Sequence, residues 1–338
     1  MIRQRVVLIT GAGGEIGHSL VERLGNDSTR PVITLDLNLL AAGLLSRVRT
    51  HFLGSILDGE LLDRILSEYQ VERIYHLAAL LSTRSEFAPM MAHRVNVEGT
   101  MAMLDFAQKQ GESHGFPVVF MYPSSIAVFG MPNLKVKREA GAVPEDLYNQ
   151  PTTMYGCNKL YCEQLGRYYA RHYKQLANDR QSGKVDFRCI RFPGLISAFT
   201  VPSGGTSDYG PEMIHSVAKG EPYACFVRPD TRIPFMTMPD AVDALLKLAD
   251  APHEQLTRTV YNLKAFSPTA EEFATMSREF FPGATITTKL DDKRQGIIDS
   301  WPADVDDSAA RRDWGFDPKH SFGRAFRDYL VPELKRGG

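Results

Sequence analysis

The chain has 338 residues, of which 43% are hydrophobic and 23% charged, an ordinary globular composition with room for one large domain and a smaller lobe. Its 39 basic and 40 acidic side chains give a formal net charge of -1, which excludes a global field that would recruit nucleic acid or an anionic membrane surface. No apolar run approaches the roughly 20 residues of a membrane span. The four cysteines show no CxxC spacing, which predicts reduced thiols and a cytoplasmic protein.

The first predicted strand and the turn after it are typical of a dinucleotide-binding site. Residues 6–9 form a continuous apolar, β-branched run, which predicts a strand buried on both faces of a parallel sheet. Gly11, Gly14 and Gly17 follow and open a helix predicted over residues 18–24. A turn without Cβ atoms lets backbone N–H groups approach a pyrophosphate at the helix N-terminus.

A second predicted strand, residues 31–35, ends at Asp36, nineteen residues after Gly17. In dinucleotide-binding folds an acidic residue about 20 positions past the glycine turn binds the ribose hydroxyls. A carboxylate at that place also repels a 2′-phosphate. Asp36 therefore predicts NAD rather than NADP as the cofactor.

Strand and helix patterns continue to alternate through the first half of the chain. Strands are predicted at residues 50–53, 73–77 and 117–122, and helices at residues 58–69 and 91–110. This series predicts the α/β class, with a Rossmann-type doubly wound parallel sheet and a smaller mixed α/β substrate lobe.

Three features near these elements are assigned simple structural roles. His76, at the end of a predicted strand, is expected to be a packed core histidine. The basic run Lys135–Arg138 is expected to be a solvated loop. The paired serines Ser124 and Ser125 are expected to open a loop after the strand at residues 117–122.

Tyr155 and Lys159 are four residues apart in the stretch Pro151–Glu163, which predicts that they lie one turn apart on one helix face. A phenol has an ordinary pKa of about 10 and is a poor base at neutral pH unless a nearby positive charge stabilises the phenolate. Lys159 supplies such a charge. The pair alone is equally consistent with an amphipathic helix that carries a Tyr and a Lys by chance.

The regular alternation ends near Pro193, after a polar stretch at residues 178–184 and a strand predicted at residues 186–192. Residues 1–195 are therefore assigned to an NAD-binding domain, to which residues 235–250 return. Residues 196–338 are assigned to the substrate lobe and a C-terminal helix. The lobe is expected to contain short strands near Tyr223 and Phe235 and helices at 240–248, 269–279 and 322–334.

The glycine turn, Asp36, the HLAA run at 76–79, the NVEGT run at 96–100, the paired serines and the Tyr155 and Lys159 pair together resemble the extended short-chain dehydrogenase/reductase superfamily. The resemblance implies that Tyr155 is the catalytic acid/base and that Lys159 lowers its pKa and holds the nicotinamide ribose. It also implies that Ser125 binds the reacting oxygen, with Ser124 as the close competitor.

The same resemblance implies the cofactor contacts, and no metal is expected. The implied contacts are Gly11, Gly14, Glu15, Ile16, Gly17, Asp36, Leu37, Asp58, Leu77, Ala78, Ala79, Asn96, Tyr155, Lys159, Pro193 and Leu195. One position departs from the superfamily pattern. Ser55 stands where an acidic residue is usual, with Asp58 nearby, so the adenine contacts are left open there.

The second half separates two groups within the superfamily. Nucleotide-sugar epimerases and dehydratases carry an Arg-x-x-Asn type segment after the sixth strand, whereas this chain has RFPGLIS at 191–197. That segment and the runs at 203–209, 233–240, 299–304 and 311–315 resemble the short-chain family of L-threonine 3-dehydrogenases. The resemblance implies NAD-dependent oxidation of the 3-hydroxyl of L-threonine. Expected substrate contacts are Ser82, Ser125, Tyr155, Gly205, Thr206, Ser207 and Trp301, which is expected to cap the pocket.

Two rival functions and one assembly are also kept as expectations. The rivals are a nucleotide-sugar epimerase or dehydratase and a non-catalytic NAD-binding protein. The predicted helices at 91–110 and 155–173 carry apolar residues on more than one face, which predicts a homodimer, with a thick internal core as the alternative. These residues include Met101, Leu104, Tyr161, Leu165 and Tyr169.

Overall fold

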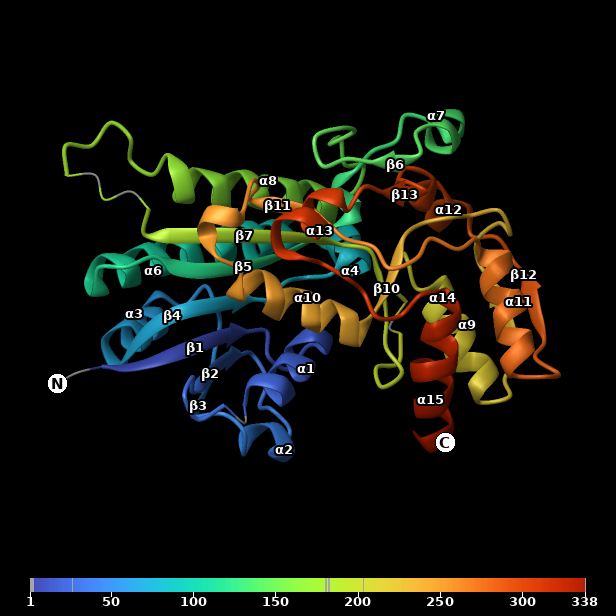
Figure 1. The fold of residues 1–338 in the computed structure, drawn as a ribbon, viewed down its shortest axis with the longest axis horizontal. Coiled ribbons are helices and arrows are strands. Elements are labelled where there is room, and N and C mark those ends of the chain that lie inside the picture. Colours follow the sequence, from blue (N-terminus) through green and yellow to red (C-terminus); the bar gives the residue numbers. More distant parts are fainter. Residues whose placement is uncertain (1–2, 26, 180, 182, 203, 338) are drawn as a thin grey trace.

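A parallel sheet of seven strands lies at the centre of the computed structural model, which describes residues 3–25, 27–179, 181, 183–202 and 204–337 (Figure 1). The strand order is β11-β7-β5-β4-β1-β2-β3, and every neighbouring pair is parallel. Their bounds are β1 Gln4–Thr10, β2 Val32–Asp36, β3 Thr50–Leu53, β4 Tyr69–His76, β5 Val118–Ser125, β7 Val185–Phe192 and β11 Val260–Asn262. Because the chain crosses from β1 to both sides, the predicted Rossmann-type doubly wound sheet is confirmed.

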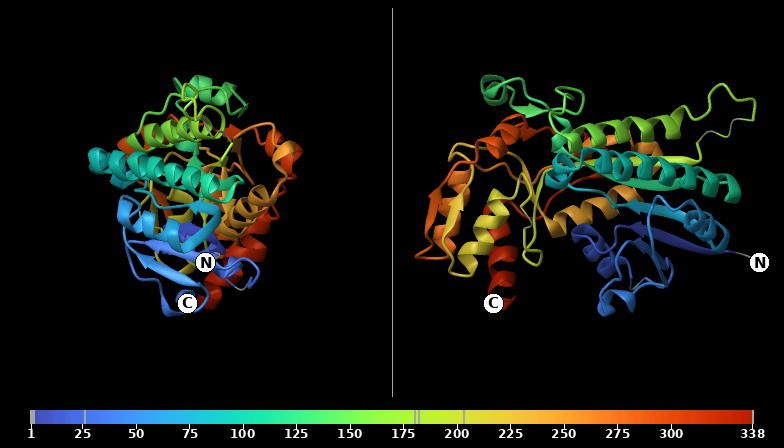
Figure 2. Two further views of the ribbon diagram at one scale, coloured as in Figure 1. Left: turned by 90° about the vertical axis from the view of Figure 1, so that its left-hand side faces the viewer. Right: turned by 180° about the vertical axis from the view of Figure 1, so that it is seen from behind.

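Helices cover both faces of the sheet, and each face has its own hydrophobic core (Figure 2). The helices on one face are α3 Gly59–Glu68, α6 Gly99–His114 and α8 Met154–Arg171, and those on the other are α1 Glu15–Leu24, α10 Met238–Asp250 and α13 Ser308–Trp314. Leu8 and Phe120 belong to the first core, while their neighbours Ile9 and Met121 belong to the second. The strands therefore bury both faces, as their continuous apolar runs predict.

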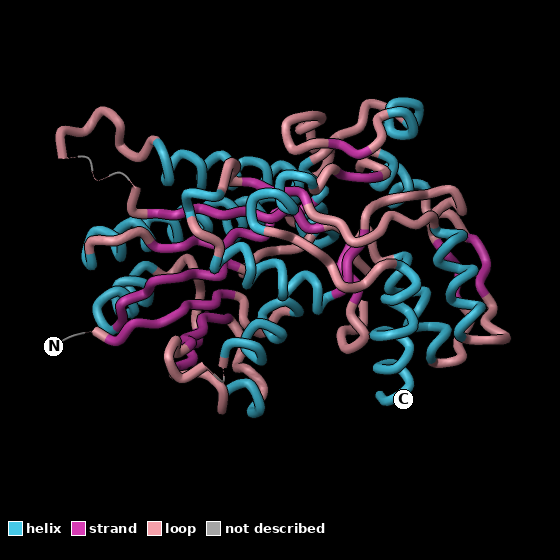
Figure 3. Tube along the Cα trace, in the orientation of Figure 1, coloured by secondary structure: helices cyan, strands magenta, loops and turns pink. Residues whose placement is uncertain are grey.

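A smaller lobe lies beyond the carboxyl ends of the strands, and Figure 3 shows that it consists mainly of helices and the long loops that join them. Its elements are α9 Tyr209–Ala218, β9 Tyr223–Cys225, α11 Ala270–Phe280, β12 Ile286–Thr288, α12 Asp292–Asp299, α14 Phe322–Arg324, η4 Ala325–Leu330 and α15 Val331–Gly337. Edge-to-face rings form its core, with centroids 5.5 Å apart for Tyr209 and Phe235 and 5.1 Å apart for Phe235 and Phe273. In the described part of the chain no helix is long and apolar enough to cross a bilayer.

The part of the chain that returns from the lobe to the sheet is longer than the predicted residues 235–250. Strand β10, Phe235–Thr237, pairs with β8, Gly194–Ile196, and leads into α10 on the sheet. Strand β11 then pairs with β7 as an edge strand of the sheet, and α13 joins the same core as α10. Residues that the sequence assigns to the lobe thus complete the central sheet.

Several short elements lie in the connections between the longer helices and strands. They are α2 Ala42–Leu45, α4 Ser82–Phe87, α5 Pro89–His93, the π-helical turn η1 Arg94–Glu98, the 3-10 turns η2 Ile126–Val128 and η3 His253–Gln255, α7 Leu134–Glu139, and β6 Ala142–Val143 paired with β13 Asp304–Val305. Residues 180 and 182 of the predicted polar stretch, and Ser203 of the 203–209 run, lie outside the described residues.

Two predicted loops are wrong. Ser124 and Ser125 are the last residues of β5, because pairing with β7 continues until Ser125 lies opposite Phe192. The basic run at 135–138 lies in α7, and Lys137 is buried with its Nζ donating to the carbonyl of Ile298 at 2.8 Å. Burial lowers the pKa of Lys137 to about 8. Its amine satisfies a carbonyl near the C-terminus of α12, a contact that no local sequence pattern signals.

Candidate active site

The glycine turn packs directly against the segment that follows β4, the strand next to β1. Gly11 has a φ of +67°, and a Cβ atom there would lie 2.6 Å from the backbone nitrogen of Ala78. Only glycine combines this conformation with that close approach. Gly14 is the N-cap of α1, and Gly17 is buried within the helix. The glycine turn and the N-terminus of α1 therefore lie at the carboxyl edge of the sheet, the place at which dinucleotide-binding folds bind a pyrophosphate.

Asp36 lies beside this turn at the end of β2. Its Oδ2 accepts a hydrogen bond from the backbone nitrogen of Gly13 at 2.9 Å, and its Oδ1 accepts one from Asn38. These donors fix the carboxylate at the same edge of the sheet as the glycine turn. Leu37, the next residue, is exposed. The position is suited to bind a ribose next to the pyrophosphate.

The HLAA run lies at the end of β4, next to the glycine turn. The backbone nitrogen of Leu77 donates to the backbone carbonyl of Thr10 at 3.1 Å. Asn96, in η1, binds the backbone of Leu80, the residue that follows the HLAA run, through both ends of its side-chain amide. Its amide oxygen accepts from the nitrogen of Leu80 at 2.7 Å, and its amide nitrogen donates to the Leu80 carbonyl at 3.0 Å. Asn96 therefore anchors the backbone beyond Leu77, Ala78 and Ala79.

The buried ring of His76 has two hydroxyl partners, Thr10 at 2.8 Å and Thr100 at 3.1 Å. Burial lowers its pKa to about 3, so the ring is neutral. The prediction of a packed core histidine is confirmed.

The remaining expected cofactor residues differ in their surroundings. Asp58 is the N-cap of α3 and accepts from the nitrogen of Leu61 at 3.1 Å, so one of its carboxylate oxygens has a structural role. Ile16 packs against the core between α1 and α10. Pro193 and Leu195 lie where the chain leaves β7 and enters β8, beyond the carboxyl end of the sheet.

Glu15 connects the glycine turn with the lobe. Desolvation and the neighbouring carboxylate of Asp208 raise the pKa of Glu15 to about 7, against a hydrogen bond with Thr200 that lowers it. Thr200 and Asp208 belong to the segment between β8 and α9. This segment of the lobe therefore faces the N-terminus of α1.

Helix α8 begins immediately before Tyr155. The hydroxyl of Thr153 accepts from the nitrogen of Gly156 at 3.1 Å, and the carboxylate of Glu86 in α4 accepts from the nitrogen of Met154 at 2.6 Å. A Cβ at Gly156 would lie 2.0 Å from the carbonyl oxygen of Ala127. The first turn of α8 is thus pressed onto η2, two residues after Ser125.

Lys159 lies one turn further along α8 and is buried. Its Nζ donates to the carbonyl of Pro123 at 2.6 Å and lies 4.6 Å from the ring centroid of Tyr122 and 5.4 Å from that of Tyr155. The predicted juxtaposition of Tyr155 and Lys159 is therefore present. Burial lowers the pKa of Lys159 to about 8.

Tyr155 is half-buried, and desolvation raises its pKa above the ordinary value of a phenol. In the protein alone, desolvation thus outweighs the stabilisation of the phenolate that the sequence analysis assigns to Lys159. The lysine is close to the ring, but its shortest bond is to a backbone carbonyl. The phenolate needs a further positive charge or hydrogen bond, which a bound ligand can supply.

The two candidate serines have different partners. The hydroxyl of Ser124 is buried and donates to Oε1 of Glu163 at 2.6 Å. The hydroxyl of Ser125 is partly exposed and accepts from the nitrogen of Ala127 at 3.2 Å, so its own proton can go to a ligand. The geometry favours Ser125 over Ser124 as the group that meets a reacting oxygen.

Sequence reasoning missed a buried ion pair behind these serines. The carboxylate of Glu163, one turn after Lys159, accepts hydrogen bonds from Nε of Arg191 at 2.9 Å and from its Nη2 at 2.7 Å. The signals in the sequence are an i, i+4 spacing from Lys159 and an arginine that lies between the apolar residues Ile190 and Phe192 near the carboxyl end of β7. Arg191 also donates to the carbonyl of Glu145 at 2.8 Å.

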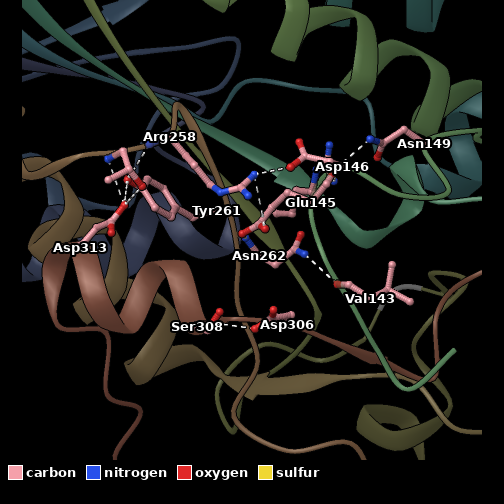
Figure 4. A network of polar contacts seen from close by, with 12 residues as sticks. Val143, Glu145, Asp146, Asn149, Arg258, Tyr261, Asn262, Asp306, Ser308 and Asp313 are labelled. Carbon is pink, nitrogen blue, oxygen red and sulfur yellow. Dashed lines mark hydrogen bonds and ion pairs between the residues drawn. The ribbon is translucent and has the colours of Figure 1, made fainter.

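Glu145 links this pair to a second polar network (Figure 4). Its carboxylate accepts from the nitrogen of Asn262 at 3.1 Å and lies 3.8 Å from Arg258, which also donates to Asp146 at 2.7 Å. Asn262 in turn donates to the carbonyl of Val143 at 3.1 Å. The network fastens β11 to the segment that precedes α8.

Two hydrogen bonds join the segments that carry the expected substrate residues. Thr83, next to Ser82 at the start of α4, donates to the carbonyl of Gly204 at 3.0 Å, which brings Ser82 near the segment of Gly205, Thr206 and Ser207. The hydroxyls of Thr152 and Ser300 are 2.9 Å apart, which joins the start of α8 to the turn that holds Trp301.

Trp301 is buried in the core of the lobe, against which Tyr155 also packs. Its indole nitrogen has no hydrogen-bond partner among the residues that the structure describes. Within the same residues, no group of three or more His, Cys, Asp and Glu side chains is arranged to hold a metal ion.

Comparison with known proteins gives a consistent result. A model of the NAD dependent epimerase/dehydratase family matches residues 7–263. The mitochondrial L-threonine 3-dehydrogenase of Bos taurus is 35% identical over 336 residues, which cover 98% of this chain and 81% of the bovine protein. The structure of L-threonine dehydrogenase from Clostridium difficile has a TM-score of 0.86 and 32% identity, covering 100% of this chain and 99% of that one. A monomeric L-threonine 3-dehydrogenase from a metagenome has a TM-score of 0.83 and 35% identity, covering 98% and 99%.

Asp36 gives a prediction about cofactor selection. Replacing it by Ala removes the carboxylate that repels a 2′-phosphate, so the ratio of the Kd for NADPH to that for NADH should fall by about tenfold, which corresponds to about 1.4 kcal/mol. Titration of the coenzyme fluorescence with wild type and Asp36→Ala measures both constants. An unchanged ratio would assign cofactor selection to another residue.

Proposed function

Because the chain belongs to the NAD dependent epimerase/dehydratase family, we propose that it is an NAD-dependent dehydrogenase that oxidises the 3-hydroxyl of L-threonine to 2-amino-3-oxobutyrate. The observation that carries the proposal is the docking of α8 on the end of β5. Lys159 reaches Pro123 and Gly156 meets Ala127, so the helix that carries Tyr155 lies against the strand end that carries Ser125.

Tyr155 would act as the general base. Ser125 donates its hydroxyl proton to the oxygen of the substrate alcohol, and Tyr155 as phenolate removes the proton from that oxygen. Lys159 favours the phenolate and binds ribose hydroxyls. Proton transfer of this kind typically contributes 10²-fold to 10⁴-fold. NAD, which the glycine turn and Asp36 would hold, would supply the hydride acceptor for this oxidation.

The glycine turn and Asp36 support NAD as the form of the cofactor. The N-terminus of α1 offers backbone N–H groups to the pyrophosphate, and the Asp36 carboxylate suits unmodified ribose hydroxyls. Leu77, Ala78 and Ala79 would line the path between them. Asn96 would support this path through Leu80 rather than through a direct contact, since both ends of its amide bind that residue.

The ends of the amino acid need different partners. Its ammonium requires acceptors and its carboxylate requires donors. Ser82 at the start of α4 and the segment of Gly205, Thr206 and Ser207 offer hydroxyl and backbone groups of both kinds. Trp301 offers an indole N–H that lacks a partner among the described residues and an apolar surface that excludes water.

A nucleotide-sugar epimerase or dehydratase is the alternative within the family. Such enzymes need a side-chain amide after the sixth strand to meet the substrate diphosphate, and this chain has Gly194 there. A Cβ at Gly194 would lie 2.5 Å from the ring of Phe235, so the packing leaves no room for an amide side chain. This contact favours a small substrate. The intact Tyr155, Lys159 and Ser125 argue against a binding protein without catalysis.

We also propose a homodimer formed through α6 and α8. Met101 and Tyr161 are 45% and 52% exposed on these helices, whereas Leu104 and Tyr169 belong to the internal core. Light scattering of the wild-type protein should give twice the mass of one chain. Tyr161→Arg should lower the measured mass to that of one chain, because a charge replaces an apolar contact. A monomeric wild type would leave the exposed side chains without this role. The metagenome relative described as monomeric makes this measurement necessary.

A cytoplasmic location stays a prediction from the thiols. Cys157 is exposed, Cys162, Cys189 and Cys225 are buried, and all four are free. Free cysteines are typical of a reducing compartment. The name of the bovine relative assigns that protein to mitochondria.

Tyr155→Phe tests the base. It should retain NADH binding while the rate of NADH formation from L-threonine falls by about 10²-fold or more, because the ring stays and only the phenol oxygen is lost. Absorbance of NADH with L-threonine and other hydroxy amino acids measures the rate. An epimerase would return its hydride and give no net NADH. Full turnover by the variant would remove Tyr155 from the mechanism.

The pH dependence tests the role of Lys159. In wild type the rate at saturating NAD should rise with pH until Tyr155 is deprotonated in the complex. Removing the positive charge in Lys159→Met raises the pKa of Tyr155, so the rising limb should move upward by about one pH unit, a differential interaction of about 1.4 kcal/mol. If the rising limb of the rate lies at the same pH in the variant and in wild type, Lys159 does not stabilise the phenolate.

A further inference from the structure

Helix α8 contacts the end of β5 through successive turns of one face. Tyr155, Lys159 and Glu163 are four residues apart, so their side chains lie in a row along the helix. Lys159 donates to the carbonyl of Pro123 at 2.6 Å, and Glu163 accepts from the hydroxyl of Ser124 at 2.6 Å. Two neighbouring residues of β5 are therefore held by two successive turns of the helix, immediately before Ser125.

The Glu163 carboxylate is itself held rigidly. Arg191 of β7 donates to both of its oxygens, at 2.9 Å and 2.7 Å, in the bidentate geometry that fixes a carboxylate in one plane. Arg191 lies opposite Ser124 in the pairing of β5 with β7. Glu163 is 1% exposed, and Arg191 and Ser124 are each 3% exposed, so water does not compete for these bonds.

We propose that Glu163 is a positioning residue for the dehydrogenase reaction. By accepting the Ser124 hydroxyl it fixes the backbone at the end of β5, and thereby the distance from Ser125 to Tyr155. This inference rests on the proposed function, since it concerns the reacting groups of that site. A displacement of about 1 Å between reacting groups costs up to about 10²-fold in rate.

Stability alone gives no reason for an ion pair at this place. Taking two charges out of water costs several kcal/mol, and well-packed apolar side chains of similar volume are often as stable. A carboxylate, however, provides an acceptor that meets Ser124 in a fixed direction, which an apolar side chain does not. The distinguishing property is therefore the acceptor rather than the charge.

Two matched double variants separate the acceptor from the charge. E163M/R191M removes both buried charges and the acceptor, whereas E163Q/R191M removes both charges and keeps an amide oxygen for Ser124. Neither leaves an unpaired buried charge. The measurements are the melting temperature, the Kd for NADH by fluorescence, and kcat and KM for NADH formation.

We expect both double variants to fold and to bind NADH with Kd values within about twofold of each other, with kcat about tenfold lower in E163M/R191M than in E163Q/R191M. Equal kcat values, or a difference confined to KM, would overturn the positioning role. If E163M/R191M does not fold, the variant Ser124→Ala tests the proposal by itself. It leaves the ion pair intact and should lower kcat by about tenfold, so a kcat equal to that of wild type would overturn the proposal.

The wild-type enzyme separates this inference from the proposed function. If wild type forms NADH from another hydroxy amino acid but not from L-threonine, the threonine assignment fails, and the variants are compared on the substrate that is oxidised. If wild type is active and the double variants have equal kcat values, only the positioning role fails.

Discussion

The buried ammonium of Lys159 is the interaction on which the arrangement of the candidate site depends. A charged group in the interior is tolerated only when hydrogen bonds or aromatic faces replace the water it has lost. Here the Pro123 carbonyl and the rings of Tyr122 and Tyr155 do so. These partners come from the end of β5 and from α8 itself, so satisfying the ammonium requires the helix to sit on the strand end. The same burial lowers the pKa of Lys159 to about 8.

The sheet and the lobe meet through a small number of directed polar contacts around this point. Thr83 donates a hydrogen bond to Gly204, and the hydroxyls of Thr152 and Ser300 are hydrogen-bonded to each other. The carboxyl group of Glu15 lies near Thr200 and Asp208. Each contact joins a segment at the carboxyl edge of the sheet to a segment of the lobe. Because ligands of open α/β sheets bind at that edge, we expect a substrate and cofactor to bind beside the residues that align the two parts.

Local sequence patterns were sufficient for the doubly wound sheet of the first half of the chain and for the placement of the main candidate residues. The glycine turn, Asp36 and the spacing of Tyr155 and Lys159 are local, because each depends on residues close in the chain or on the periodicity of one element. Their chemical roles stay predictions. The resemblance favours Ser125 with Ser124 as the close competitor, and the geometry also favours Ser125, because the hydroxyl of Ser124 is bound to Glu163. That contact links residues 39 positions apart and is not visible in the sequence.

Features that depend on distant partners were not predictable. Lys137 reads as solvated because its acceptor, the Ile298 carbonyl, is 161 residues away in the chain. The Glu163 and Arg191 pair brings together a helix and a strand that share no motif. Likewise β11 has only three residues, too few for a periodic signal, and its place is set by pairing with β7 and by the Asn262 contacts. The effect of burial on the Tyr155 pKa also depends on packing that no spacing reveals.

The late arrival of β11 has a consequence for how the chain emerges from the ribosome. Until residue 262 has been made, β7 is an open edge with unpaired N–H and C=O groups along a strand whose residues are all buried in the finished protein. Such an edge is prone to pair with other chains. The edge of β7 is therefore available for pairing with other chains while the roughly seventy residues from 193 to 262 are synthesised.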